Sequence, residues 1–184
     1  EIPLRLVGSE MCIRDSYQIL CDFANQKNNM SILNWNLKKP GEWAETDWIY
    51  DSVSEKYRLY DCNFNCLKLD GNIDLSGCTK IDNIDFASNN IRTVTLPVRN
   101  INEGEFYNCS KLEAVILQGG TTISSGAFMN CPALQAIYIP DSIADISDDA
   151  FANSSKVTIC ANTGSFAEAF ANKKGINFKS GSFL

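Results

Sequence analysis

The segment Gly126-Ala-Phe-Met-Asn-Cys131, followed by Leu134-Gln-Ala-Ile-Tyr-Ile-Pro140, carries the pattern that decides the fold of this 184-residue chain. Ile137 and Ile139 lie two positions apart, so both side chains share one face of a strand and Tyr138 points to the other face. Four more apolar pairs have this form, and the first residues of successive pairs lie 21, 21, 22 and 20 positions apart. The five pairs are Ile73/Leu75, Val94/Leu96, Val115/Leu117, Ile137/Ile139 and Val157/Ile159. Because so short a unit cannot bury an apolar face alone, the period predicts a β-rich repeat solenoid of stacked coils with a parallel sheet.

Other positions of each coil repeat in step with the pairs. A phenylalanine has an isoleucine five positions before it and an asparagine two positions after it, and a cysteine or serine comes next. These sets are Ile101/Phe106/Asn108/Cys109, Ile123/Phe128/Asn130/Cys131 and Ile146/Phe151/Asn153/Ser154. We expect the phenylalanine to fill the core and the asparagine to bond unpaired backbone amides at a tight corner.

These residues resemble a known family. Gly104-Glu-Phe-Tyr-Asn-Cys109, Gly126-Ala-Phe-Met-Asn-Cys131 and Asp149-Ala-Phe-Ala-Asn-Ser154 are similar to the BspA-like class of bacterial leucine-rich repeats, with a specific match from about Leu96 to Phe178. Upstream, Ile84-Asp-Phe-Ala-Ser-Asn-Asn-Ile91 resembles the broader leucine-rich pattern. The resemblance implies a non-catalytic adhesion or binding module of a bacterial cell-surface or secreted protein. The alternative is a structural spacer in a larger, possibly catalytic, surface protein.

Both ends of the array differ from the repeats. We predict an N-terminal cap at residues 17–60, the solenoid at residues 61–160, and a C-terminal cap and tail at residues 161–184. In the N-terminal cap, one helical face is shared by Ile19, Leu20, Phe23 and Ala24. In the C-terminal cap, Phe166, Ala169 and Phe170 at helical spacing, followed by Lys173-Lys174-Gly175, predict a short capping helix. A short strand, Ile176-Asn-Phe178, is expected after it. The pattern near Leu67 and Leu69 does not decide whether these residues begin the main sheet of the solenoid or its opposing face.

The N-terminal cap also holds all three tryptophans, Trp35, Trp43 and Trp48. Packing in the cap is the favoured interpretation, because tryptophan is usually buried. The alternative is a platform on which exposed indole rings stack against sugars.

A non-native leader is predicted at residues 1–16. Met11-Cys-Ile-Arg-Asp-Ser16 is the translation of a sequence that resembles the mosaic end of a transposase-based sequencing adaptor, and the suspect stretch extends from Leu6 to Ser16. A natural lead-in is the alternative. No secretory signal is visible, but if the original start was replaced, any signal peptide within it was lost as well.

Composition narrows the partners. The net charge of −6 argues against nucleic acid or an anionic membrane surface, and no apolar run has the length of a membrane span. We expect a protein or glycan partner and no cofactor. Without histidine, the chain cannot build a Ser-His or Cys-His pair or a histidine metal site, so we predict no enzyme, no catalytic residues and no metal site.

The cysteines permit two interpretations. Cys109 and Cys131 are equivalent positions of adjacent coils whose side chains point the same way, which favours free, buried thiols over a bridge. Cys62 and Cys66 lie where the cap meets the first coil, and a disulfide there, with Cys21 as a candidate partner, is the alternative to reduced thiols.

The residue inside each apolar pair points away from the core and is the candidate for ligand binding. Ile116 and Tyr138 are the strongest of these candidates, because an exposed tyrosine beside an aliphatic residue is typical of an interface centre. Ala114 and Ala136 flank the column on one side and Gln118 on the other. The alternative is that strand positions facing solvent simply favour such residues. The predicted column is Asp74, Thr95, Ile116, Tyr138 and Thr158.

Overall fold

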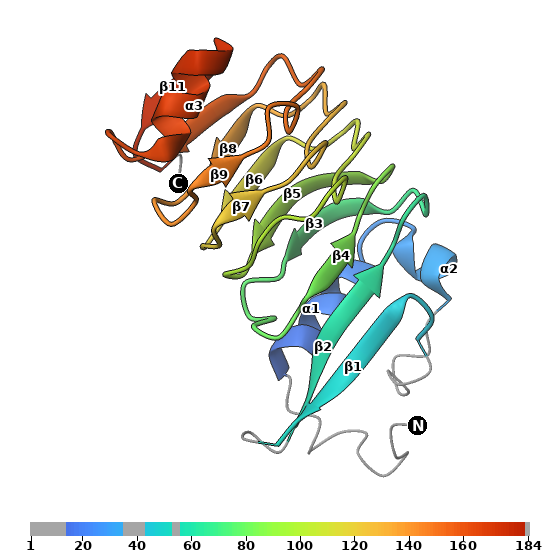
Figure 1. Ribbon diagram of the computed structural model, residues 1–184. Helices are drawn as coiled ribbons and strands as arrows, with labels where there is room; N and C mark the ends of the chain where they lie inside the picture. Colours follow the sequence, from blue (N-terminus) through green and yellow to red (C-terminus); the bar gives the residue numbers. More distant parts are fainter. Residues whose placement is uncertain (1–13, 35–42, 53–55, 183–184) are drawn as a thin grey trace.

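The computed structural model describes residues 14–34, 43–52 and 56–182. Figure 1 shows a solenoid of stacked coils, with α1, α2 and the β1–β2 hairpin at one end and α3 with β11 at the other. The predicted β-rich repeat solenoid is therefore confirmed. The elements in chain order are α1 (Arg14–Ala24), α2 (Asn29–Leu33), β1 (Thr46–Asp51), β2 (Lys56–Asn63), β3 (Asp70–Asp74), β4 (Asn83–Asp85), β5 (Asn90–Leu96), β6 (Ala114–Leu117), β7 (Thr122–Ile123), β8 (Ala136–Tyr138), β9 (Asp145–Ile146), β10 (Thr158–Ala161), α3 (Phe166–Lys174) and β11 (Asn177–Ser180).

One long parallel sheet dominates the described part of the chain. Its strand order is β11-β10-β8-β6-β5-β3, and we call it the principal sheet. The return side of the coils carries shorter pairings, in which β7 pairs with β9, and β4 joins the β1–β2 hairpin. Leu69, whose place the sequence left open, is fully buried directly before β3, so its coil belongs to the principal sheet.

Phenylalanine rings stack along the core, as the repeat predicts. The ring centroids of Phe86 and Phe106 lie 5.9 Å apart, those of Phe106 and Phe128 lie 5.4 Å apart, and those of Phe128 and Phe151 lie 5.5 Å apart. The ring planes deviate from parallel by 11° at most. Successive coils therefore place the same side chain in the same rotation about the solenoid axis.

Each cap continues this aromatic column with a ring from its own helix. Phe64, in the first coil, lies 5.2 Å from Phe86, and Phe23 of α1 packs on both at 6.4 and 6.1 Å. At the other end, Phe170 of α3 lies 6.2 Å from Phe151. The caps thus cover apolar surface that the terminal coils would expose to water.

The last coil corrects one predicted pair. Ile159 pairs in register with Ile137, so the core pair of β10 is Ile159 and Ala161 rather than Val157 and Ile159. Val157 instead follows Ser154 by three residues, as Leu134 follows Cys131, and its N–H donates to the Ser154 carbonyl at 3.2 Å. The coil is one residue shorter between this position and the strand, which is why counting along the apolar pairs misplaced it.

The asparagine corner also differs from the expectation. Asn108, Asn130 and Asn153 have φ of 60°, 59° and 61°, the left-handed region that asparagine tolerates better than most residues. Within the described part of the chain, the side chains of these three residues bond no backbone amide. They bond across coils instead: Asn153 Nδ2 donates to Asn130 Oδ1 at 2.8 Å, and Asn108 Nδ2 donates to Ser88 Oγ at 3.3 Å.

The residue after each corner asparagine hydrogen-bonds a buried backbone group of an adjacent coil. The Cys109 and Cys131 thiols donate to the carbonyls of Phe86 and Phe106, each at 3.1 Å. Ser154 Oγ donates to the Phe128 carbonyl at 2.6 Å and accepts from the Cys131 N–H at 2.9 Å. These buried cysteines are therefore hydrogen-bond donors between coils as well as small apolar side chains, and neither contributes to a disulfide.

The N-terminal cap closes the edge of β3 with side-chain amides. Gln26 Nε2 donates to the Asn72 carbonyl, and Gln26 Oε1 accepts from the Asn72 N–H, both at 2.7 Å. Asn29 does the same for Asp70, with its Nδ2 donating at 2.8 Å and its Oδ1 accepting at 2.9 Å. Two carboxamides thereby take the hydrogen bonds that a neighbouring strand would make.

The rest of this cap agrees with the predicted packing. Leu20, Phe23 and Ala24 of α1 are at most 1% exposed, and Trp43 is buried against Trp48, which packs on the core. Trp35 lies outside the described residues. Residues 14–16, which the sequence assigns to the leader, form the first turn of α1, and residues 1–13 lie outside the description.

The C-terminal helix is confirmed, but its buried face is not the predicted one. Ser165 caps α3 by accepting from the Glu168 N–H, and Gly175 ends it at φ 67°, where glycine fits best. Ala167, Phe170 and Ala171 face the core, whereas Phe166 is 43% exposed and Ala169 is also exposed. The helix is rotated so that its two alanines approach the coil closely, and Phe166 is left beside β9.

Candidate functional site

The candidate surface is the outward face of the principal sheet, and the strand register defines its columns. Asp74 pairs with Thr95, Thr95 with Ile116, and Ile116 with Tyr138, so these four predicted residues form one column. Thr158 is not its fifth member, because it pairs with Ala136, and Cys160 pairs with Tyr138. This misplacement has the same cause as the shifted apolar pair in the last coil.

Thr158 belongs to a second, parallel column that starts at Asn72. It runs through Thr93, Ala114 and Ala136, and it ends at Asn177 of β11. Cys160 is only 1% exposed, although it continues the first column. The accessible part of the first column is therefore interrupted between Tyr138 and Lys179 of β11.

The middle of this face carries no charge. Thr93, Thr95, Ala114, Ile116, Ala136 and Tyr138 are neutral and half-buried. Asp74 lies at one end of the first column, and Lys179 of β11 lies at the other. Small side chains in one column lie beside Ile116 and Tyr138 in the other. A partner can therefore contact apolar groups on this face without desolvating ions.

Charged residues lie at one flank of the same sheet, where they neutralise one another. Arg92 contacts Asp70 at 3.2 Å and Glu113 at 3.1 Å, and Lys111 contacts Asp70 at 3.0 Å. Burial of the Asp70 carboxyl opposes its ionisation, but hydrogen bonding and the charges of Lys111 and Arg92 hold its pKa below the usual value. The uncharged face thus has a polar rim along this side.

A hollow borders the face at its N-terminal end. It has a volume of about 240 Å³, and one wall is formed by Ile19 and Asp22 of α1 and by Gln26, which follows the helix. Thr93, Thr95 and Asp74 line it from the sheet. The sequence does not reveal this wall, because α1 and the sheet residues lie far apart in the chain and share no motif.

A buried ion pair lies outside the candidate surface. Arg99 and Glu105 make two hydrogen bonds, at 2.9 and 2.6 Å, and their side chains are 7% and 1% exposed. Arg99 also donates to the Asp82 carbonyl at 2.7 Å. Burial raises the pKa of Glu105 to about 7 against the opposing effect of Arg99. Both side chains have partners within the fold, which indicates a structural role.

The cysteines near the cap have contrasting environments. Cys62 is fully buried, and burial raises its pKa well above the ordinary value. Cys66 is exposed at φ 62°, and its thiol donates to Asn65 Oδ1. Neither of these two residues is in a disulfide. Cys21 lies within α1 and is buried.

The acidic residues of the last coil serve the backbone. Asp149 accepts from the hydroxyls of Ser125 at 2.8 Å and Ser147 at 2.7 Å, and from the Gly126 N–H at 3.3 Å. These hydrogen bonds, with that from Ser147 the largest contribution, lower its pKa. Within the described ranges, no group of three or more histidine, cysteine or acidic side chains is arranged to hold a metal ion.

No helix in the part of the chain that the structure describes is long and apolar enough to cross a membrane.

Comparison with known proteins agrees with the coil geometry. Searches of curated proteins and of solved structures gave no match. The family model of the BspA type leucine rich repeat region matches residues 55–176 in six copies. This range begins one residue before β2 and ends two residues after α3, so it covers the stacked coils and their C-terminal helix. The chain therefore belongs to the BspA type leucine-rich repeat family.

Proposed function

We propose that this protein is a non-catalytic binding module that recognises a partner protein through the outward face of the principal sheet. The observation that carries the proposal is the uncharged middle of that face, with Ile116 and Tyr138 paired in register on neighbouring strands. Aromatic and aliphatic side chains at the centre of a patch, with ionic residues restricted to its rim, are characteristic of protein interfaces. Thr95 and Asp74 extend the contact toward α1, and Thr158 extends it from the second column.

The setting we propose is the bacterial cell surface or the secreted fraction, with adhesion as the role. This part rests on membership of a family whose repeats are often found in surface proteins that bind other proteins. Glycan recognition uses stacked aromatic rings and hydrogen-bonding side chains, and the face offers only Tyr138 as a ring beside small residues. A protein partner therefore fits the face better than a glycan.

A matched pair of double variants tests the proposal. Ile116→Glu with Tyr138→Glu places two charges on the face, and Val98→Glu with Tyr107→Glu makes the same chemical change at exposed positions outside both columns, where Val98 is 71% and Tyr107 41% exposed. Surface proteins captured by the immobilised wild type are quantified against both variants. We expect the face variant to lose the proteins that the wild type captures and the control variant to retain them. The circular dichroism spectra of both variants should be unchanged.

Equal capture by the two double variants would contradict the placement of the site. If the native wild type captures no more protein than a denatured sample does, the result would favour the spacer role, in which no face has affinity of its own. Photo-crosslinking from position 138 then identifies the partner directly, with position 107 as the reference.

A further inference from the structure

The end of the short β7–β9 sheet, on the return side of the coils, leaves a strand position open. Ile101 pairs with Ile123, and Ile123 pairs with Ile146 of β9, so three buried isoleucines follow one another along the axis. At each step, the backbone N–H and C=O of the earlier isoleucine point toward the following coil and hydrogen-bond to it. The Ile101 N–H donates to the Thr122 carbonyl at 3.0 Å, and its carbonyl accepts from the Ser124 N–H at 2.9 Å.

The same geometry recurs one coil later. The Ile123 carbonyl accepts from the Ser147 N–H at 2.9 Å. By the alternation of a parallel ladder, the N–H and C=O of Ile146 point to the next position along the axis. Among the residues that the structure describes, no backbone or side-chain group bonds them. The ladder therefore ends with one unpaired donor and one unpaired acceptor.

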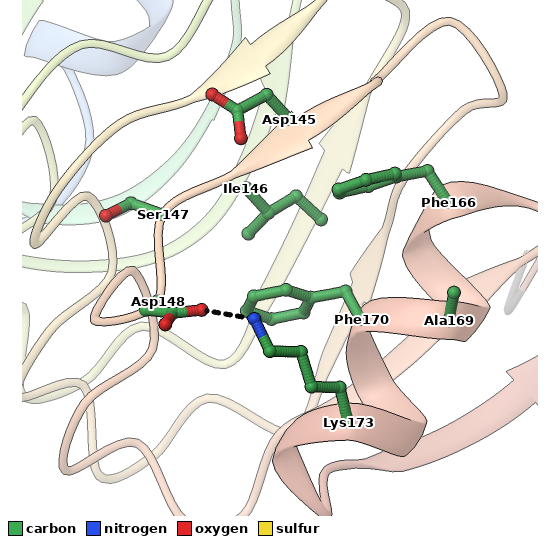
Figure 2. A pocket seen from close by; sticks show the side chains of 8 residues that line it. All are labelled: Asp145, Ile146, Ser147, Asp148, Phe166, Ala169, Phe170 and Lys173. Atoms are coloured by element: carbon green, nitrogen blue, oxygen red, sulfur yellow. Dashed lines mark hydrogen bonds and ion pairs between the residues drawn. The ribbon is translucent and has the colours of Figure 1, made fainter.

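Helix α3 stands beside this edge, but it does not fill it. A groove of about 520 Å³ lies between β9 and the helix, lined by Ile146, Phe166, Ala169, Phe170 and Lys173 among others. Figure 2 shows Phe166 and Phe170 extending from α3 toward β9. Phe166 is 43% exposed there, in contrast to the buried alanines of the same helix. The groove thus combines a strand edge with an apolar wall.

The charges of the groove are unbalanced at one position. Asp148 contacts Lys173 at 3.1 Å and Lys174 at 2.9 Å, so that carboxylate has cationic partners. Asp145 is exposed, and it has no cationic partner in the described ranges. Because Thr122 pairs with Asp145, a residue placed next in this register would lie beside the Asp145 carboxylate.

We propose that this groove binds an extended segment of a partner protein, which adds to β9 as a parallel strand with the sequence cation, aliphatic residue, small polar residue. The aliphatic residue pairs with Ile146, and its side chain packs against Phe166. As in the ladder from Ile101 to Thr122 and Ser124, the carbonyl of the preceding residue accepts from the Ile146 N–H, and the N–H of the following residue donates to the Ile146 carbonyl. The lysine or arginine before it lies beside Asp145. The chain's own Thr122-Ile-Ser124 and Asp145-Ile-Ser147 show the same aliphatic and serine positions in the coils below. Such strand addition takes affinity from the main chain and specificity from alternate side chains.

The test is a titration followed by amide NMR, with the acetylated and amidated peptide Ala-Thr-Lys-Ile-Ser-Ala as the probe. We expect saturable shifts centred on Ile146, Ser147 and α3. Replacing the peptide serine by N-methyl-serine removes the backbone donor to the Ile146 carbonyl and should weaken binding about three- to tenfold. Phe166→Ala should also weaken it, whereas Val98→Ala, at an exposed aliphatic residue elsewhere, should not.

A charge exchange distinguishes the proposed register from general stickiness. Asp145→Lys should lose affinity for the lysine peptide and gain affinity for the peptide with glutamate in its place. Glu103→Lys changes another exposed acid outside the groove and should leave both affinities as in the wild type. Circular dichroism verifies that each variant is folded.

Three results would overturn the proposal. These are equal binding of the N-methylated peptide, shifts centred away from β9, and shifts in the groove that depend on protein concentration without peptide. The last result would assign the groove to a second copy of this chain. Failure of the peptide to bind is independent of the principal sheet, so the two proposals are tested separately.

Discussion

The rings of Phe106 and Phe128 lie on equivalent positions of neighbouring coils, 5.4 Å apart and 8° from parallel. Both side chains are fully buried. Each ring thus contacts a ring above and a ring below, and removal of one deprives each of its two neighbours of one aromatic contact.

Phe128→Ala tests this stacking. The substitution opens a cavity in the middle of the column, where the adjacent coils cannot collapse without losing strand register. We expect a loss of about 3–5 kcal/mol in the free energy of unfolding. Urea denaturation followed by circular dichroism measures it. Phe166→Ala removes the same side chain from an exposed site, and an equal loss in that variant would refute the core assignment.

Ser154→Ala tests the hydrogen bonds between coils. Without the hydroxyl, the Phe128 carbonyl and the Cys131 N–H lose their buried partner, and we expect a cost of about 1–3 kcal/mol. Ser154→Cys should be less costly, because a thiol makes the equivalent bond at Cys109 and Cys131. Chemical denaturation of both variants is the measurement. Equal stability of the two would show that the donor contributes nothing.

Gln26→Ala tests the closure of the β3 edge. The variant leaves the N–H and C=O of Asn72 without their partner, so we expect faster hydrogen exchange at the Asn72 amide. Exchange in β8, at the centre of the principal sheet, should not change. Asn25→Ala, at the preceding exposed residue, is the matched control. Unchanged exchange at Asn72 would show that the carboxamide is dispensable.

Glu105→Gln tests the buried ion pair through pH. Burial raises the folded-state pKa of Glu105 to about 7, above its ordinary value of 4.5, so the folded protein binds this proton more tightly than the unfolded chain. Its contribution to stability is therefore present below about pH 4.5 and declines as pH rises toward 7. We expect the wild type to lose stability relative to Glu105→Gln across this window.

Urea denaturation of both proteins at several pH values measures the difference in their free energies of unfolding. In this difference, the contributions of the other carboxylates cancel. A wild type that instead gains stability relative to the variant as pH rises would mean that Arg99 lowers the pKa of Glu105 more than burial raises it.

The downstream coils were predictable from sequence because their columns are chemically distinct. Phenylalanine, the preceding isoleucine and the following asparagine recur together around Phe106, Phe128 and Phe151, and each has a steric reason. The coils at Phe64 and Phe86 were harder to recognise, because their corner residues are Cys66 and Ser88 rather than asparagine. The structure shows that the corner requires a left-handed backbone rather than a particular side chain.

The candidate surface was predictable in composition, but not in full register. One residue fewer before β10 moved Thr158 into the neighbouring column, and the apolar pairs alone cannot reveal such a deletion. The position of Val157, three residues after Ser154, contains the signal that locates it. Contacts made by the cap, such as that of Gln26 with Asn72, join residues 46 positions apart and have no local signature.

The two ends of the principal sheet set the type of self-assembly open to this protein. Strand β11 is at the end of the strand order, whereas Gln26 and Asn29 already occupy the hydrogen-bonding edge of β3. Growth of a filament by head-to-tail addition would require β11 of one molecule to displace both carboxamides of the next. Pairing of β11 with β11 would leave them in place and would give a closed twofold dimer. The N-terminal cap thus occupies the edge at which a further strand would otherwise add to the stack of repeats.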